Sequence, residues 1–296
     1  MLRRRLLPAA ARMVRAAAPS GSAAAVASAT SPIVTAATTF GAASALGFGI
    51  SMVTGVHYHL DLVGTGVFTV VALGTTGVHM RQRTSAFAVA LWATKLTSFL
   101  FYRALQVKHD GRLTEPLSST SGTFGFWFIT FLWNVLVALP HTLAAGVPLA
   151  SRPPFGVASD FVGLGLFALG LLIETTADYQ KWTFKHDAAN AGKFCDVGVW
   201  QMSQHPNWLG NIVLWTGISV LNLPTLLAAG HAHAISALAA PVFLILLFYG
   251  EATDVIGKAA ELSQSKYGAD PNFKRYVATT PLVMPTPASI SRLLGE

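Results

Sequence analysis

Long apolar runs dominate this sequence, and each is close to the roughly 20 residues that a helix needs to cross about 30 Å of hydrocarbon. Hydrophobic residues make up 52% of the 296 residues and charged residues only 11%, which is typical of a polytopic helical membrane protein. We therefore predict an all-α fold, a polytopic transmembrane helical bundle of about seven spans. The predicted spans lie near residues 33–55, 60–80, 85–106, 122–147, 156–178, 207–229 and 234–254.

The N-terminal residues differ in composition from the rest of the chain. Residues 1–36 are rich in Arg, Ala and Ser, and the first acidic residue is Asp61. This composition is typical of organelle-transit peptides, whereas Pro8 and Arg12 interrupt the apolar region that a secretory signal requires. We expect residues 1–36 to be an organelle-targeting presequence and residues 37–296 a single transmembrane domain. The expected location is the mitochondrial inner membrane, with the endoplasmic reticulum membrane or a plastid membrane as alternatives.

The net charge of +7 arises mainly from the first fifteen positions, which hold five of the 20 Lys and Arg residues. The remaining 15 basic residues nearly balance 13 acidic residues, so nothing in the charge distribution indicates a nucleic-acid partner. Cys195 is the single cysteine and cannot form an intrachain disulfide. The histidine pairs 57/59 and 231/233 lack a third ligand at a usable spacing, so no metal site is predicted.

Basic residues are unevenly distributed among the predicted loops. Arg81, Arg83 and Arg152 are the three on one side, whereas eleven lie in the loops after spans three and five and in the tail. The positive-inside rule therefore places those two loops and the tail on the inner face. Seven spans would then leave the mature N-terminus outside, whereas a matrix-directed presequence favours an N-terminus inside. The eleven are Arg103, Lys108, Arg112, Lys181, Lys185, Lys193, Lys258, Lys266, Lys274, Arg275 and Arg292.

The most polar stretch is residues 174–217. If the preceding helix continues into it, Glu174, Asp178, Lys181 and Lys185 fall at positions 0, +4, +7 and +11, within a sector of roughly 60°. These side chains would form one ionic face of a helix at the membrane boundary. The alternative is an interfacial cap in which the charged side chains extend to water.

A second helix is predicted to begin at Pro206, because proline suits the first helical position. Asn207, Asn211 and Trp215 follow at a spacing of four residues, on one face. The positive end of this helix, near His205, would suit an anion such as phosphate. Alternatively, the asparagines could simply join neighbouring helices.

The pattern E-x3-D-x-Q-K-x2-F, followed by G-x-W and S-x-H-P-N-aromatic-x-G, resembles the C-terminal domain of the steroid 5α-reductase superfamily. Its uncharacterised polytopic membrane-protein branch is the most similar. The resemblance covers roughly residues 57–287 and includes the stretches 91–112 and 266–285. It implies an NADPH cofactor and reduction of a conjugated C=C bond in a lipophilic small-molecule substrate, steroid or isoprenoid in type, that enters from the lipid bilayer.

The resemblance also implies the residues that bind the cofactor. Basic side chains would contact its phosphates, the central motif its neutral polar parts, and the tyrosines of the tail would orient the nicotinamide. No catalytic residue is assigned, because the proton donor has no matched position. The implied cofactor-binding residues are Arg112, Glu174, Asp178, Lys185, His205, Asn207, Asn211, Trp215, Tyr267 and Tyr276.

Three positions depart from the family pattern and weaken the expectation of phosphate binding. Gln204 replaces an Arg, Asn211 replaces a carboxylate, and Lys95 replaces an Arg inside the third span. A lysine within a span is costly unless it is paired, and Asp61 is the partner that we expect. Two other functions therefore remain open: a non-catalytic membrane subunit of an organellar, for example respiratory, complex, or an S-adenosylmethionine-dependent lipid methyltransferase.

The glycines of the fifth span do not form a dinucleotide-binding motif, although their pattern is G-x-G-x4-G. No strand precedes Gly163, Gly165 and Gly170, and such a motif needs a strand before it and a helix after it. We interpret them as small residues at which helices pack closely.

Overall fold

The computed structural model describes residues 31–295 apart from 57, 108–110 and 115–116, and it omits the side chains of residues 111 and 112. Helices and connecting turns make up this part of the chain, which contains no strand, so the predicted all-α class is confirmed. Most of the predicted presequence lies outside the described residues and stays a prediction. Six helical segments are long and apolar enough to cross a membrane. They are α1 (Pro32–Thr54), α4 (Met80–Val107), α6 (Thr120–Gly146), α7 (Ala158–His186), α8 (Pro206–Ala229), and α9 (His231–Ala237) together with α10 (Ala239–Ala252).

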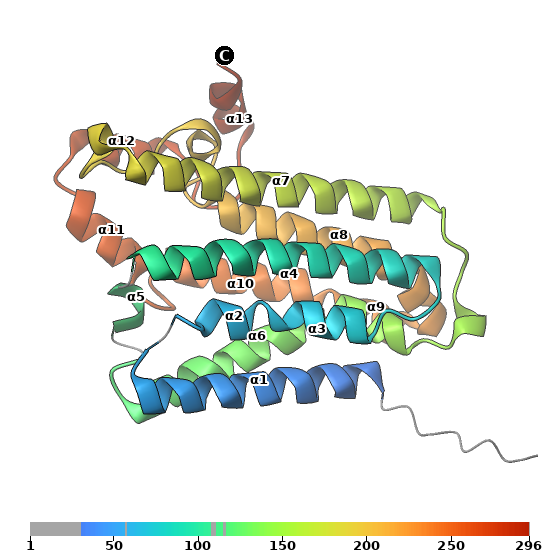
Figure 1. The fold of residues 1–296 in the computed structure, drawn as a ribbon. Coiled ribbons are helices and arrows are strands. Elements are labelled where there is room, and N and C mark those ends of the chain that lie inside the picture. The colour runs from blue at the N-terminus through green and yellow to red at the C-terminus, as the bar shows by residue number, and fades with distance from the viewer. Residues whose placement is uncertain (1–30, 57, 108–110, 115–116, 296) are drawn as a thin grey trace, which may run out of the picture. The chain divides into compact units, whose positions relative to one another are not determined.

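The predicted second span is two short helices, α2 (Leu60–Gly64) and α3 (Val67–Gly74), interrupted at Thr65 and Gly66. Together they cover 15 residues, or about 22 Å at 1.5 Å per residue, which is less than the hydrocarbon thickness. This segment nevertheless carries the chain from one end of the bundle to the other, as Figure 1 shows. The prediction of about seven spans is therefore roughly consistent with the structure, although the second is shorter than a full transmembrane helix.

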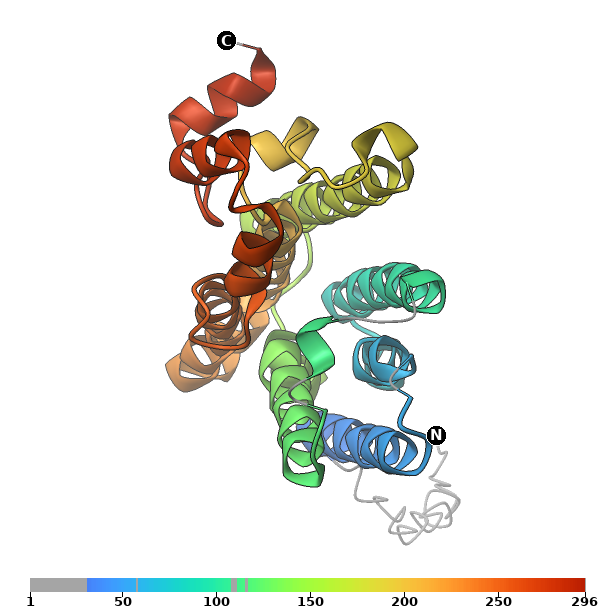
Figure 2. The same cartoon turned by 90° about the vertical axis from the view of Figure 1, so that its left-hand side faces the viewer.

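Helix α8 is the central helix of the bundle, since it contacts α4, α6, α7, α9 and α10. Figure 2, which views the helices nearly end-on, shows α7 and α10 on two sides of it. Fourteen of its residues are buried, more than in any other described helix. Side chains that α8 directs inward are therefore enclosed by helices from all parts of the sequence.

Close packing of α7 on α8 depends on four glycines. A Cβ on Gly163 would lie 2.5 Å from the Leu221 backbone nitrogen, and one on Gly170 would lie 2.4 Å from that of Leu214. Likewise, a Cβ on Gly210 or Gly217 of α8 would lie 2.5 Å from a backbone nitrogen of α7. These distances leave no room for a side chain, so the helix-packing interpretation is confirmed for Gly163 and Gly170. Gly165 has open space beside it and takes no part.

Short elements collect at the two ends of the bundle (Figure 1). The end at which α7 finishes also has α5 (Gly111–Thr114), α11 (Ala259–Tyr267), α12 (Pro271–Thr279) and α13 (Pro287–Leu294), with the 3-10 turns η2 (Ala188–Asn190) and η3 (Gly198–Gln201). The opposite end has α9 and the turn η1 (Leu149–Ser151). The central motif and the C-terminal tail therefore lie at the same end, which we call the tail end.

Candidate functional site

Both local predictions for the central motif are confirmed. Helix α7 continues to His186, so Glu174, Asp178 and Lys185 belong to one helix. Helix α8 begins at Pro206, directly after His205. The motif is therefore a helix end, a loop and a helix start, and its two helices are those joined by the four glycines.

Three helices bring polar side chains together inside the bundle. Lys95 Nζ of α4 lies 3.1 Å from Asp178 Oδ2 and 3.4 Å from Glu174 Oε2, both of α7. Asn211 Nδ2 of α8 donates to Glu174 Oε1 at 2.9 Å, and Trp92 Nε1 donates to the same oxygen at 3.3 Å. Glu174 is only 2% exposed. We call these five residues the carboxylate cluster.

The expected pairing of Lys95 with Asp61 is wrong, because its ion-pair partners are the two carboxylates of α7. Helices α4 and α7 start at the same end of the bundle, and Arg81 of α4 pairs with Asp160 of α7. Fourteen residues after this pair on each helix, Lys95 lies opposite Glu174. Asp61 belongs to the first turn of α2.

Charge does not balance within the carboxylate cluster. With all three groups ionised, one lysine faces two carboxylates, and the sum is −1. Ionisable groups within a membrane-spanning bundle are costly and commonly mark functional sites. Two further basic residues, Arg103 and Lys181, also act electrostatically on Asp178 and offset part of this imbalance.

Aromatic rings enclose one side of the cluster. The fully buried ring of Trp215 packs edge-on to Trp92 with centroids 5.0 Å apart, and lies 5.6 Å from Phe68. Trp215 Nε1 and Asn211 Oδ1 are buried and have no hydrogen-bond partner within the described part of the chain. One unused donor and one unused acceptor, a turn apart on α8, fit a neutral polar group such as an amide.

At the tail end, exposed Lys185 lies against the C-terminal tail. Its Nζ donates to Tyr267 Oη at 2.8 Å and to the Lys193 carbonyl, and it lies 4.9 Å from the Tyr267 ring centroid. Residues 174 and 185 are eleven positions apart, about 16 Å along the helix. Lys185 and Tyr267 therefore form a second polar group, separate from the carboxylate cluster.

Tyr276 fixes the tail to the motif. Its hydroxyl donates to the Trp200 carbonyl of η3 at 2.9 Å, and its ring packs on Phe194 with centroids 5.3 Å apart. Burial raises the pKa of the Tyr276 phenol, since it disfavours the phenolate. The hydroxyl is therefore a hydrogen-bond donor with a structural partner.

The remaining predicted residues lie at the start of α8 or outside the described side chains. His205 stacks on Trp208 with ring centroids 3.9 Å apart, and its backbone N–H donates to Ser203 Oγ at 3.1 Å. Asn207 is the half-buried second residue of α8. Arg112 belongs to α5, but its side chain is outside the described residues. The structure thus brings Glu174, Asp178, Asn211 and Trp215 together and joins Lys185 to Tyr267, whereas His205 and Tyr276 have other partners.

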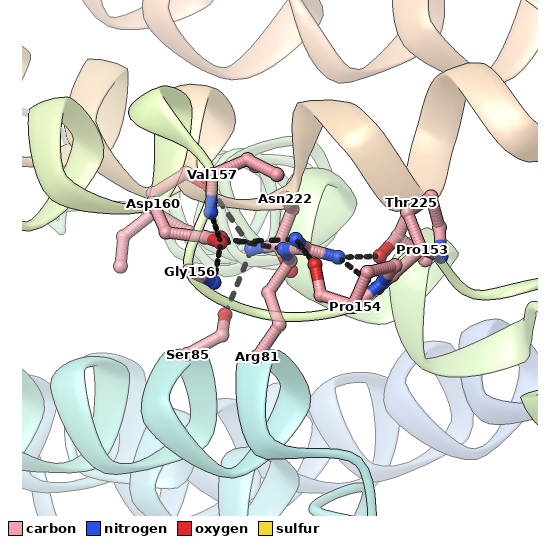
Figure 3. Close-up of polar contacts among 10 residues, drawn as sticks. Arg81, Ser85, Pro153, Pro154, Gly156, Val157, Asp160, Asn222 and Thr225 are labelled. Carbon is pink, nitrogen blue, oxygen red and sulfur yellow. Dashed lines mark hydrogen bonds and ion pairs between the residues drawn. The ribbon is translucent and has the colours of Figure 1, made fainter.

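Sequence reasoning missed a buried ion pair at the opposite end of the bundle, shown in Figure 3. Arg81, predicted to be a loop residue, is 1% exposed and contacts Asp160 at 2.6 and 3.0 Å. Its other donors reach Thr225 Oγ1 and the carbonyls of Pro153 and Pro154. All five guanidinium donors are thus satisfied, so this pair joins α4, α7 and α8 and leaves no donor for a ligand.

Sequence reasoning also missed Trp92, which lies in the stretch 91–112, and Ser85 and His141, which belong to no motif. His141 Nδ1 lies 2.9 Å from Ser85 Oγ, to which Asn222 Nδ2 donates at 2.8 Å. The available signal was a seven-residue interval between polar side chains in two apolar spans, Asn134 with His141 in α6 and Trp215 with Asn222 in α8. That interval places the polar residues of a helix on one face.

These features define a polytopic helical membrane protein with a buried ionic cluster beneath a polar tail end. Residues 47–280 match the model of the family described as "Protein of unknown function (DUF1295)". The match covers most of the chain, so this protein belongs to that family of membrane proteins. No curated protein and no solved structure matches the chain.

Proposed function

We propose that this protein is a membrane-embedded, NADPH-dependent reductase of a conjugated C=C bond in a lipid-like substrate of the steroid or isoprenoid type. The observation that carries the proposal is the carboxylate cluster. Glu174 and Asp178 come from one part of the motif, and Asn211 comes from another. Within the membrane-spanning bundle the two carboxylates contact Lys95 of α4, and Asn211 contacts Glu174. Such a buried ionic group is costly to the fold and supports a function. The resemblance of the motif to the steroid 5α-reductase superfamily supplies the reaction.

The two polar groups suit different parts of the proposed cofactor. Lys185 is exposed at the tail end, where a cation can contact a phosphate by charge-assisted hydrogen bonds. Within the bundle, the Asp178 carboxylate can accept hydrogen bonds from the neutral polar parts of the cofactor. Bound NADPH would supply a hydride, and the chain would position the cofactor and exclude water from it. We also include Arg112 among the residues that contact the phosphates, and this assignment rests on the family resemblance alone.

Nucleotide titration of the detergent-purified protein tests this proposal. We expect saturable binding of NADPH that Lys185→Met weakens by about 10- to 150-fold, since a charge-assisted hydrogen bond contributes about 1.5–3 kcal/mol. Lys274→Met is the matched control, because Lys274 is an exposed lysine of the same tail end that is not among the implied cofactor-binding residues. If Arg112 reads the 2′-phosphate, Arg112→Ala should weaken NADPH more than NADH.

A gain-of-binding variant makes the test decisive. Gln204→Arg restores the family residue and should tighten NADPH binding. Asn211→Glu is unsuitable as a partner substitution, because it would place a third carboxylate beside Glu174 and Asp178. If neither the wild-type protein nor Gln204→Arg binds NADPH or NADH saturably, the reductase proposal is wrong.

A second candidate function is a non-catalytic subunit of an organellar membrane complex. It is favoured by Gln204, whose side-chain amide donates to the carbonyls of Thr280 at 2.6 Å and Val277 at 3.2 Å. The position that departs from the family pattern thus fixes the tail in place. Stable co-purification with a larger assembly on native gels, without nucleotide binding, is the result that this candidate predicts.

We place the protein in the mitochondrial inner membrane on the composition of residues 1–36. N-terminal sequencing of the protein purified from cells should find a mature N-terminus well after Arg15, at about residues 20–40. An intact Met1 on the membrane-inserted protein would contradict a cleaved presequence.

A further inference from the structure

Two buried polar side chains on different helices lack hydrogen-bond partners. Asn134 of α6 and Trp215 of α8 are both 0% exposed. Within the described part of the chain, neither amide atom of Asn134 has a partner, and neither does Trp215 Nε1. A buried polar group without a partner costs about 1–3 kcal/mol, so two such side chains need an explanation.

The register of the bundle places these two residues at the same level. Ser85 joins His141 of α6 to Asn222 of α8, at 2.9 and 2.8 Å. Helices α6 and α8 both begin at the tail end, so they run in the same direction (Figure 1). Seven residues before His141 is Asn134, and seven before Asn222 is Trp215. Seven residues are nearly two helical turns. Asn134 therefore lies on the same face of α6 as His141, and Trp215 on the same face of α8 as Asn222, each about 10 Å nearer the tail end.

Ring contacts support this register independently. Phe68 of α3 contacts Trp133 with centroids 5.2 Å apart and Trp215 with centroids 5.6 Å apart. Trp92 of α4 contacts the same two tryptophans, at 6.4 and 5.0 Å. The neighbour of Asn134 in the chain thus shares two aromatic partners with Trp215. Asn211, whose Oδ1 also lacks a partner, lies one turn from Trp215.

We propose that Asn134, Trp215 and Asn211 form a binding site for the oxygen-bearing head of a lipid-like ligand, a carbonyl or a hydroxyl. Trp215 Nε1 and Asn134 Nδ2 are the donors, and the Oδ1 atoms of Asn134 and Asn211 are the acceptors. A carbonyl would use the donors, and a hydroxyl would use both kinds. Phe68, Trp92 and Trp133 provide apolar surface for the carbon skeleton beside it.

The polar groups on either side of this site are paired within the described part of the chain apart from Asn222 Oδ1, whereas Asn134 and Trp215 have no side-chain partner there. At one side Glu174 accepts from Asn211, Trp92 and Lys95, and at the other Ser85 joins His141 to Asn222. Between these two groups, Asn134 and Trp215 have donor and acceptor atoms without hydrogen-bond partners in the described part of the chain. The inference shares the lipid-like ligand of the proposed function but needs no nucleotide, so its test omits NADPH.

The Trp215 indole proton is a direct probe of the site. Protein labelled with 15N-tryptophan and purified in detergent would be titrated with cyclohexanone, with cyclohexanol and with methylcyclohexane, a hydrocarbon of similar shape. Trp215→Phe identifies the resonance. We expect cyclohexanone and cyclohexanol to shift this indole proton saturably, and methylcyclohexane to leave it in place.

Asn134→Leu is the variant that separates a binding role from a structural one. Leucine has the same number and branching of side-chain heavy atoms as asparagine, and the amide has no partner to lose, so the unfolding temperature should stay unchanged or rise. Binding of cyclohexanone should weaken at least tenfold. Gln82→Leu, which removes a buried amide that donates to the Thr75 carbonyl, should lower the unfolding temperature instead and thus shows that the assay detects a structural amide.

Three results would overturn the proposal. An indole shift of equal size with methylcyclohexane would show an apolar cavity only. No shift with any of the three compounds would show that the level is closed or permanently filled by water. A loss of stability in Asn134→Leu with unchanged cyclohexanone binding would show that Asn134 is structural.

Discussion

Lys95 shows how a single residue depends on partners that lie 79 and 83 positions away in the sequence. Lys95→Met removes the cation and leaves Glu174 and Asp178 facing each other inside the bundle. We expect a loss of about 3 kcal/mol in unfolding free energy, the low end for a broken buried ion pair because the Lys95 side chain is 22% exposed. Reversible unfolding in mixed micelles measures the loss.

A double-mutant cycle identifies the partner. Asp178→Asn combined with Lys95→Met should be less destabilising than the sum of the two single substitutions, by more than about 1 kcal/mol. The same cycle with Asp61→Asn should be additive to within about 0.5 kcal/mol. Coupling to Asp61 and additivity with Asp178 would contradict the arrangement of the carboxylate cluster.

Tyr276 gives a prediction for the dependence of stability on pH. Burial raises the pKa of its phenol above the ordinary value near 10, so the unfolded chain ionises first as the pH rises. The stabilisation is complete below about pH 10 and is lost as the pH rises from there towards the folded pKa. Tyr276→Phe should lose about 1 kcal/mol at pH 8 with the hydrogen bond to Trp200, but its stability should fall less steeply between about pH 10 and 11. Equal slopes for the two proteins would show that Tyr276 ionises in the folded state.

At the scale of the element, the packing of α7 on α8 can be tested with two glycines of one helix. Gly163→Ala would place a Cβ 2.5 Å from the Leu221 backbone nitrogen and should cost about 1–3 kcal/mol, because the helices must separate. Gly165→Ala meets no atom within 4 Å and should be neutral or stabilising by up to about 1 kcal/mol. Thermal unfolding of the two variants side by side gives the comparison, and equal losses would contradict the close contact.

The helices themselves could largely be predicted from the sequence, because length and hydropathy define a transmembrane segment locally. The start of α8 at Pro206 and the continuation of α7 past Glu174 also follow from local rules. The break of the second span into α2 and α3 could not be predicted, because a run of apolar residues contains no information on where its helix is interrupted. A Cβ at Gly66 would lie 2.4 Å from the Leu62 carbonyl oxygen and 3.2 Å from the Thr97 side chain of α4, so both the local backbone and helix packing favour glycine at this turn.

The carboxylate cluster could be predicted only in part. The spacing of Glu174 and Asp178 placed them on one face, but which cation lies opposite depends on the register between α4 and α7. That register is fixed by contacts such as the pair of Arg81 with Asp160, and a pair of residues so far apart in sequence has no local signal. The unpaired amide atoms of Asn134 could not be predicted either, because a single sequence does not show whether a buried amide has a hydrogen-bond partner.

At the scale of the whole molecule, the structure strengthens the asymmetry of charge between the two ends. Of the three basic residues expected opposite the tail end, Arg81 is buried and Arg152 donates to the carbonyls of Val147 and Ala145. Burial also lowers the pKa of the Arg152 guanidinium. The water-exposed positive charge is therefore concentrated at the tail end, which the positive-inside rule places on the inner face.

Single-cysteine labelling tests this orientation. In a Cys195→Ser background, Ser265→Cys introduces an exposed thiol on α11 at the tail end, and Ser151→Cys introduces one on η1 at the opposite end. Expressed in the bacterial inner membrane, Ser265→Cys should react with a membrane-impermeant maleimide in inverted vesicles but not in intact cells with a permeabilised outer membrane. Ser151→Cys should show the reverse pattern, because an odd number of spans separates the two positions. Three spans, α7, α8 and α9 with α10, lie between the two positions, so labelling of both thiols from the same side would show that at least one of them does not cross the membrane. Exchange of the two patterns would show that the tail end faces outward.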